Sequence, residues 1–489
     1  MKATIKKRRL LYTLLFVAGL FLVLCIPDNS KPSIVSASSE QPFQWNSDSL
    51  WMDLEQQFEK ASVNQADLPK IIYAQTVVDS LLATLPDSSY GPGNSAFNEL
   101  LQGFFRYAVQ VAATHQFTDS LRFRYITLRK KIKEQSEFWP ENQISRTTLY
   151  RLMYGSRAAW EEVILQTQYR GDPLLIFNTT NDQKHKCRMV RGTWICSGDL
   201  LLSRGGATVS ALIARASNYQ GNFSHVAVVH VDDSSGVISL IESHIEKGVA
   251  VSDTTAYLAD KKQRICVLRI NPGILKDEGV PHTVAAALLK MGTHEKIPYD
   301  FEMNTYDSNS MFCSEVASFG YSKSGIRLWN LPSSISNPGA VSWLNAFGVT
   351  NFVSQMPSDL EYDRNIELIA EWYDTDLLLN DHLYNAAMDG LYSRASLGKE
   401  PGYNHFKLPL ARLLKGWCMI KNALGGIGAI PEGMSATIAL KNVWLTEQHQ
   451  QLLNQLKKEV ELYEKQHHHL PPYWQMVAMA EKIAKVQLP

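Results

Sequence analysis

The sequence has no excess of charge of either sign, because 48 lysines and arginines balance 48 aspartates and glutamates among 489 residues. After the first ten positions it also lacks any basic stripe with interleaved aromatic residues, and no internal repeat is visible. Balanced charge argues against a general nucleic-acid binder. Apolar residues are plentiful, since 45% of the chain is hydrophobic. A chain of this length and composition can bury a large core and is expected to form about two to four domains.

The amino terminus carries a long stretch without charge. Lys6-Lys7-Arg8-Arg9 precedes an apolar run from Leu10 to Ile26. The run is intermediate in length between a secretory signal and a minimal transmembrane helix, and its basic flank predicts that the rest of the chain is exported. Residues 1–26 therefore fit an inner-membrane anchor facing the periplasm and a cleaved signal of a periplasmic protein equally well. Residues 27–45, rich in Ser, Pro and Asn, are expected to form a flexible linker.

Changes in the spacing of apolar residues divide the rest of the chain into three regions. From 46 to 170 apolar residues recur every three or four positions, which predicts a helical domain. Short β-rich runs follow, and their segregation from two helices indicates an α+β domain with an antiparallel sheet at 171–365. The helical period then returns and predicts a C-terminal helical region at 366–489. The expected strands are 174–177, 199–203, 225–231, 237–243, 248–252 and 265–270, and the expected helices from 207 onward are 207–219, 282–291, 366–395, 406–423, 445–466 and 473–486.

The chain has six cysteines. Cys187 and Cys196 bracket a segment that predicts a hairpin turning at Arg191-Gly192, so a disulfide between them fits an oxidising compartment. Two unpaired strand cysteines are the alternative that the sequence leaves open. Cys266 and Cys418 lie in apolar runs and are expected in the core.

Three consecutive histidines, His467 to His469, end one of the expected C-terminal helices. They invite a metal assignment, but consecutive side chains at a helix end point in different directions. A solvated cap is the favoured interpretation. No metal or organic cofactor is required by any other motif.

Cys313 lies where an irregular segment meets an apolar run of helical period. At a helix start, backbone N–H groups and the positive end of the helix dipole favour the thiolate, which is the nucleophilic form of cysteine. An isolated cysteine is nevertheless more often a small core residue. The assignment of a chemical role to Cys313 therefore depends on partners elsewhere in the chain.

A candidate base and its partner lie on two successive expected strands. His225 begins one strand, Glu242 lies in the next, and a hairpin centred between Asp233 and Ser234 would set the two directly opposite. A one-residue slip would move them to opposite faces. A carboxylate bonded to one ring nitrogen leaves the other nitrogen free to accept a proton from a thiol. His230 and His244 lie nearby and are alternative bases.

Six short segments occur in the order seen in a known family. They resemble the YiiX/YaeF-like permuted papain-like amidases, relatives of the NlpC-type cell-wall peptidases, over residues 196–365. The resemblance implies a circularly permuted papain-like fold, in which the histidine strand precedes the cysteine helix. The matching segments are Gly198 to Leu202, Phe223 to Val229, Ile241-Glu242, Pro298 to Phe301, Phe312 to Glu315 and Pro357 to Leu360.

The resemblance also implies roles for individual residues. Cys313 becomes the nucleophile, His225 the general base and Glu242 the orienting carboxylate. The segments around them imply four residues of the substrate pocket, which are Tyr299, Asp300, Ser224 and Ser314. The polar stretch between Asp300 and Cys313 departs from the family pattern.

These roles predict an exported thiol hydrolase that attacks an amide or ester carbonyl. The family implies a cell-wall peptide, a peptide amide or a lipid acyl group as substrate, no cofactor, and no nucleic acid as partner. The membrane is an expected partner through the N-terminal apolar run. An acyltransferase of the same fold and a non-catalytic envelope scaffold or binding protein are the alternatives.

Overall fold

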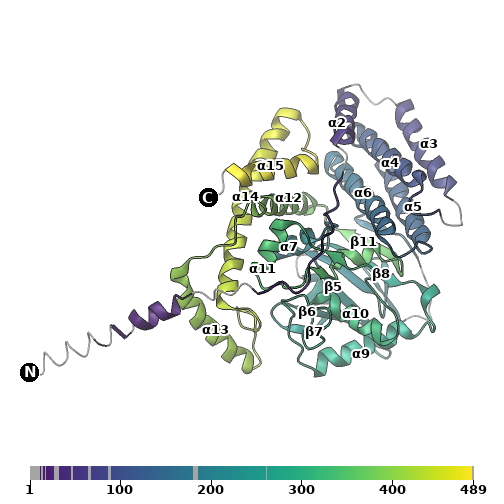
Figure 1. The fold of residues 1–489 in the computed structure, drawn as a ribbon. Helices are drawn as coiled ribbons and strands as arrows, with labels where there is room; N and C mark the ends of the chain where they lie inside the picture. The colour runs from purple at the N-terminus through teal and green to yellow at the C-terminus, as the bar shows by residue number, and fades with distance from the viewer. Residues whose placement is uncertain are drawn as a thin grey trace, which may run out of the picture.

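The centre of the protein is a seven-stranded antiparallel sheet, with helices both before and after it in the chain (Figure 1). The structure, a computed structural model, describes residues 12, 15–16, 18–26, 32–45, 48–63, 68–85, 90–179, 186–259 and 262–486. This arrangement confirms the α+β class with an antiparallel sheet between two helical regions.

The strands of the large sheet have the order β1-β11-β8-β4-β5-β6-β7. The run from β4 to β7 is a meander, while β8 returns to pair with β4 on its other side. The strands that were expected from the sequence are all present, with ends that differ by a few residues at most. Their bounds are β1 Leu174–Ile176, β4 Leu200–Gly205, β5 His225–Val231, β6 Ile238–His244, β7 Gly248–Asp253, β8 Lys262–Ile270 and β11 Ile366–Tyr373.

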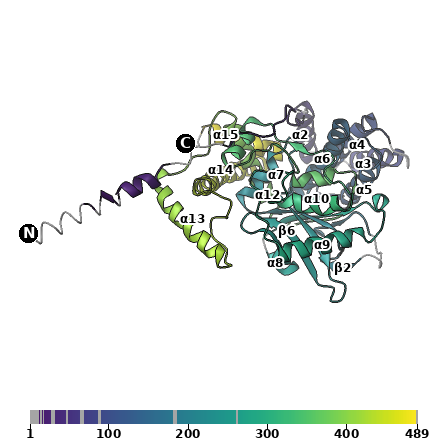
Figure 2. The ribbon, with the colours of Figure 1, turned by 60° about the horizontal axis from the view of Figure 1, so that its bottom comes forward.

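Successive residues of each strand face opposite sides of the sheet and enter different cores. On one side Val226 and Leu268 join a core that includes Val316 of helix α10 (Cys313–Lys323). Helix α9 (Val280–His294) packs beside α10 against β5 and β6 (Figure 2). On the other side Ala227 and Val267 join a smaller core.

Strand β11 corrects one prediction from the sequence. Residues 366–395 were expected to form a helix, but Ile366–Tyr373 is a strand that pairs with β1 and β8. The sheet therefore continues past the predicted domain boundary at 365, and the helix α12 begins at Leu378. The prediction was wrong because an apolar-rich run of eight residues fits both periods, and its distant partners β1 and β8 decide between them.

The helical region before the sheet spans α2 to α6. Asn94 caps α4 and Asn142 caps α6, each through a side-chain oxygen that accepts a backbone N–H. Buried ion pairs fasten this layer to the sheet, since Arg157 of α6 bonds Glu361 at 2.8 Å and Glu371 of β11 at 2.9 Å. The helices are α2 Asp48–Val63, α3 Leu68–Thr84, α4 Ser95–Thr114, α5 Thr118–Ser136 and α6 Gln143–Thr167.

Three of the helices after the sheet, α12, α14 and α15, pack with α7 and α11 around a second core, while α13 packs in smaller clusters. Helix α14 begins at Ala436, earlier than the expected start at Leu445, because the Ser435 hydroxyl caps it by accepting the N–H of Ile438. The helices of this layer are α7 Thr208–Ala216, α11 Pro338–Ala346, α12 Leu378–Ala395, α13 Leu408–Ala423, α14 Ala436–His467 and α15 Tyr473–Val486, and the short α8 Thr254–Ala259 lies next to the sheet.

The segment that was expected to be a flexible linker is docked over its described residues, 32–45. Ser36 bridges to Asn351, and the Phe43 N–H donates to the carbonyl of Asn218 at 2.9 Å. The Phe43 ring also packs edge-on against Tyr150, with 5.0 Å between ring centroids. The flexible-linker prediction is wrong here because aromatic side chains within the polar segment supply a packing surface.

Part of the N-terminal apolar run is described. Residues 18–24 are helical, and Leu22 and Val23 are exposed to solvent. The basic flank Lys6 to Arg9 lies outside the described residues. A search of the described ranges for a helix long and apolar enough to cross a membrane found none.

Candidate active site

Cys313 is the first residue of α10, as the sequence predicted, and it is buried. The preceding residue, Phe312, is the N-cap, and its N–H donates to the Glu315 carboxyl group at 2.8 Å. The N–H groups of the first helical turn have no partners within the helix. The Cys313 sulfur therefore lies at the positive end of the helix dipole.

The β5–β6 hairpin has a different register from the one expected. Ala227 pairs with Glu242, so the turn is centred between Ser234 and Ser235, one position later than predicted. Each residue of β5 consequently meets a partner two positions farther along β6. His225 and Glu242 are diagonal neighbours rather than direct partners. They stay on one face because a shift by two positions preserves the side-chain alternation.

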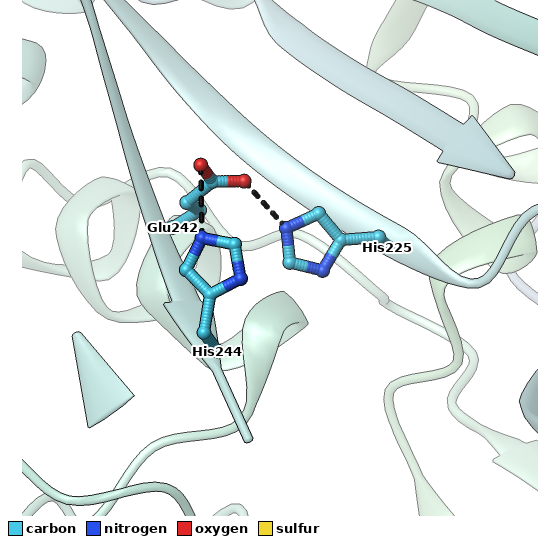
Figure 3. A group of neighbouring side chains, drawn as sticks. All are labelled: His225, Glu242 and His244. Atoms are coloured by element: carbon cyan, nitrogen blue, oxygen red, sulfur yellow. Dashed lines mark hydrogen bonds and ion pairs between the residues drawn. The ribbon is translucent and has the colours of Figure 1, made fainter. Parts of the chain in front are cut away.

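Glu242 holds two histidines at once (Figure 3). Its Oε2 lies 2.7 Å from Nε2 of His225, and its Oε1 lies 3.1 Å from Nε2 of His244. The two imidazole rings are nearly parallel, with 5.4 Å between their centroids. The hydroxyl of Ser252 on β7 also donates to Oε1. The carboxylate is thus fixed by three neighbours.

The pKa shifts of His225 and Glu242 favour a positive imidazolium paired with a negative carboxylate. Burial works to lower the pKa of His225, but hydrogen bonds with Cys313 and Glu242 and their negative charges outweigh it and raise the pKa to about 9. Burial likewise acts to raise the pKa of Glu242, yet its hydrogen bonds with His225 and His244 hold that pKa well below the usual range. At neutral pH His225 is an imidazolium and Glu242 a carboxylate.

His225 stands between the carboxylate and the thiol. Its Nε2 is bonded to Glu242, which leaves Nδ1 available to the thiol, and Cys313 lies close enough to raise the pKa of His225. The Cys313 sulfur also lies 3.9 Å from the carbonyl oxygen of Ser224, the residue before His225. Nucleophile, base and orienting carboxylate are therefore arranged in one chain of contacts.

Glu315, one turn into α10, does not add a second negative charge beside the sulfur. Burial, reinforced by the charges of Asp300, Cys313 and Asp307, raises its pKa to about 9, although the hydrogen bond from Phe312 opposes this. The carboxyl group is thus neutral at pH 7. A neutral group at this place leaves the thiolate without a repelling neighbour on its own helix.

The four residues predicted for the substrate pocket have different positions. The Asp300 carboxylate accepts the N–H groups of Glu302 at 2.8 Å and Asn304 at 2.6 Å, so it shapes its own loop. Tyr299 lies near enough to Cys313 for a negative sulfur to raise the phenol pKa, although burial raises it more. Ser224 contributes its carbonyl, and Ser314 is completely buried behind Cys313.

Of the two alternative bases, His230 lies away from the Cys313 sulfur and His244 lies beside the Glu242 carboxylate. His230 pairs with Ser239 and lies on the opposite face of β5 from His225, where its ring stacks on His282. His244 bonds the carboxylate oxygen that His225 does not use. His469, one of the three consecutive histidines, packs against the ring of Phe58.

His225, Glu242 and His244 also have the composition of a metal-binding group. One ligand atom from each lies within 4.8 Å of the others. Two imidazoles and a carboxylate are ligands that Zn²⁺ accepts. The same atoms are the ones joined by the hydrogen bonds described above, so a bound ion would replace those bonds.

The two cysteines of the predicted hairpin are joined in a disulfide. They begin β2 (Cys187–Val190) and end β3 (Thr193–Cys196), and the turn between these strands has the left-handed backbone that Gly192 accommodates. Asp199 accepts the N–H of Cys196 and pairs with Arg269 of β8 at 2.7 Å. Because Ile195 of β3 also packs with Leu201 and Ala227, the hairpin is held on one face of the sheet.

Sequence reasoning assigned no role to several neighbours of the site. His244 was considered as a base and not as a partner of Glu242, and Ser252 was not considered at all. A two-residue change of register brings His244 alongside His225, and the pairing of β6 with β7 across the short turn 245–247 brings Ser252 to Glu242. Glu315 had a recognisable signal, since an acidic residue at the third position of a helix commonly accepts the N-cap N–H.

A thiol at a helix start, a histidine on a strand before it in the chain and a carboxylate on the adjacent strand have the arrangement of a papain-like cysteine hydrolase with permuted order. Residues 195–333 match the family model of the permuted papain-like amidase enzymes of the YaeF/YiiX, C92 family. This similarity confirms the predicted resemblance over residues 195–333, while the predicted segment Pro357 to Leu360, strand β11 and the helices on both sides lie outside the match. Searches of curated proteins and of solved structures returned no significant match.

Proposed function

We propose that this protein is a cysteine hydrolase that cleaves an amide or ester bond through an acyl-enzyme. The observation that carries the proposal is the position of His225, which is hydrogen-bonded to Glu242 through Nε2 and lies close enough to Cys313 for the thiol to raise its pKa. The family match supports the reaction class, since the family consists of amidases. The substrate we propose is a cell-wall peptide, a peptide amide or a lipid acyl group.

In the first half of the reaction the Cys313 thiolate attacks the carbonyl carbon and the C=O electrons move onto oxygen. N–H groups at the start of α10 are placed to stabilise that oxyanion. As the C–N or C–O bond breaks, the His225 imidazolium gives its proton to the leaving amine or alcohol. The products of this half are a thioester on Cys313 and a neutral imidazole.

In the second half the neutral His225 takes a proton from water, and the resulting hydroxide adds to the thioester carbonyl. The C–S bond then breaks, which releases the acid and restores the thiolate beside an imidazolium. Glu242 keeps the ring oriented throughout and stabilises its positive charge. An alcohol or amine in place of water would make the same site an acyltransferase, and analysis of the products with added acceptors separates the two activities.

The test compares Cys313→Ala and His225→Ala with the unmodified protein on an activated ester and on amide substrates. We expect both variants to lose hydrolysis, and iodoacetamide to modify Cys313 below pH 7 faster than it modifies a free thiol. Activity that survives in both variants, or ordinary alkylation kinetics, would refute the mechanism. A folded protein without any activity on these substrates would favour the non-catalytic scaffold.

A metal-dependent hydrolase is the second candidate, because His225, Glu242 and His244 lie close enough to share an ion. A chelator distinguishes the candidates. The thiol mechanism predicts full activity after chelation and none in Cys313→Ala. The metal mechanism predicts the reverse, with activity restored by added Zn²⁺.

We also propose that the chain is exported and faces the periplasm, either anchored in the inner membrane or released from it. The apolar run with its basic flank supports this, and so does a disulfide between Cys187 and Cys196, because such bonds persist in oxidising compartments. Mass spectrometry of freshly isolated protein, before and after reduction, tests it. We expect the Cys187–Cys196 bond in the isolated chain, and free thiols at both positions would contradict export.

A further inference from the structure

Helix α13 carries apolar side chains that face solvent. Those within the helix recur every three or four residues and define the α13 stripe, which consists of Leu410, Leu413, Leu414, Trp417 and Ile420. Leu410 is 70% exposed and Trp417 is 62% exposed. Beyond the helix ends Phe406 and Leu424 extend the stripe, at 80% and 82% exposure. A contiguous apolar surface of this kind marks an interaction site.

The opposite side of α13 is packed, so the helix cannot roll over to bury the stripe. Leu408 and Ala411 are buried against Ala436 of α14. Farther along, Cys418 is buried with Ile430 and Met434 of the segment between α13 and α14. These contacts fix the orientation of the helix and leave the stripe facing outward.

The charged side chains of α13 itself have one sign. From Pro401 to Pro431 the chain has no aspartate or glutamate, while Lys407, Arg412, Lys415 and Lys421 are basic. Lys407 and Lys421 are exposed at the two ends of the helix. An amphipathic helix with apolar residues on one face and basic residues beside them binds the interface of an anionic bilayer.

The N-terminal apolar run ends beside this helix. Arg412 of α13 donates to the carbonyl of Leu24 at 3.0 Å and lies 3.5 Å from that of Val23. In Figures 1 and 2 the described N-terminal helix adjoins α13 at one corner of the molecule. The described end of the apolar run is thus held against α13, and it carries exposed apolar side chains of its own, Leu22 and Val23.

We propose that α13 lies in the surface of a bilayer containing anionic lipid, with the α13 stripe among the acyl chains and Lys407 and Lys421 at the phosphate headgroups. This goes beyond the hydrolase function and does not depend on Cys313. It also brings the catalytic end of the sheet toward the bilayer. The α13 residue Cys418 shares a core with Phe301 and with Ile245, the neighbour of His244.

Tryptophan quenching tests the proposal on the full chain, because residues 1–26 contain no tryptophan and cannot contribute. The chain is reconstituted with vesicles of phosphatidylglycerol and phosphatidylethanolamine that carry brominated acyl chains, and flotation verifies association. We expect bromine to quench most of the Trp417 emission, which is identified by difference with Trp417→Phe. Quenching should weaken when phosphatidylcholine replaces the anionic lipid.

Paired variants separate α13 from the N-terminal run. Leu410→Glu with Leu413→Glu, both at exposed positions, should abolish the quenching of Trp417 while the chain still floats. Val237→Glu, at an exposed position on the β5–β6 hairpin, should leave quenching unchanged, as should Cys313→Ala. Emission from Trp417 that bromine does not change, a chain that does not float, or shielding of Trp417 by a second copy of the chain would each overturn the proposal.

Discussion

Two histidine–glutamate pairs in this protein have almost the same geometry and different surroundings. Nε2 of His225 lies 2.7 Å from Glu242, and Nε2 of His382 lies 2.9 Å from Glu161. In both histidines burial acts to lower the pKa, and the neighbouring carboxylate helps to raise it above the ordinary value. The pair alone therefore does not mark a catalytic site.

The difference lies in what else each pair contacts. Glu161 is also bonded to Arg264, whose guanidinium pairs with Asp381 at 2.6 Å, so the charges around His382 belong to a closed ionic network. Within the described chain, Nδ1 of His382 has no hydrogen-bond partner. The corresponding nitrogen of His225 is not used by Glu242, and Cys313 at the start of α10 lies close enough to raise the pKa of His225. The His225 side chain is 18% exposed against 7% for His382, so solvent and substrate have access to the first.

The surroundings of the second ring nitrogen thus distinguish a histidine of a buried ionic network from a catalytic histidine. A histidine whose other nitrogen faces a nucleophile can move a proton, while one whose other nitrogen faces packed side chains can only hold a charge in place. The network around His382 ties α6, α12 and β8 together. The group around His225 joins the adjacent strands β5, β6 and β7 and also lies beside the thiol.

The largest expected effect comes from replacing each histidine with glutamine. His225→Gln should lower kcat/KM by about 10²–10⁴-fold, the usual contribution of a general acid–base group. His382→Gln should leave kcat unchanged and reduce the free energy of unfolding by about 1–3 kcal/mol, because a buried charged partner is lost. Kinetics and urea denaturation of the two variants measure both quantities.

The comparison fails if the two variants behave alike. A His382→Gln protein that keeps its fold but loses activity as strongly as His225→Gln would mean that the ionic network takes part in catalysis. A His225→Gln protein that is active and only less stable would mean that His225 has a structural role and not a catalytic one.

A smaller effect follows from the charge of His225. Because its pKa is raised from 6.5 to about 9, the stability it contributes is fully present below about pH 6.5 and is lost as the pH rises through about 9. The loss should be at most about 3 kcal/mol. In Glu242→Gln the carboxylate is absent, so the pKa of His225 should fall and the pH dependence of stability should flatten.

Histidine NMR titration measures this directly. His449 provides an internal reference, since burial lowers its pKa to about 4 and it should stay neutral throughout the range. A His225 resonance that titrates near 6.5 in the unmodified protein, or one that Glu242→Gln does not move, would contradict the proposed ion pair.

Much of the architecture was predictable because its signals are local. Short β-rich runs marked β5 and β6, recurring apolar residues marked α15 with its observed bounds, and the residues around Cys313 indicated a helix start. Strand β11 was missed because nothing within Ile366–Tyr373 separates a buried strand from a buried helix. The docking of residues 32–45 was missed because it depends on a surface formed by distant parts of the chain.

In the candidate site, too, some features follow from local sequence signals and others only from contacts between distant segments. The residue types and their order determined that Cys313, His225 and Glu242 should be considered together, because each has a chemistry that its local element makes available. The register of the β5–β6 hairpin, the second histidine on Glu242, the neutral Glu315 and the exposure of the α13 stripe were decided by the tertiary structure. Those properties depend on distances and burial between segments far apart in the chain, and a local pattern of residues does not contain them.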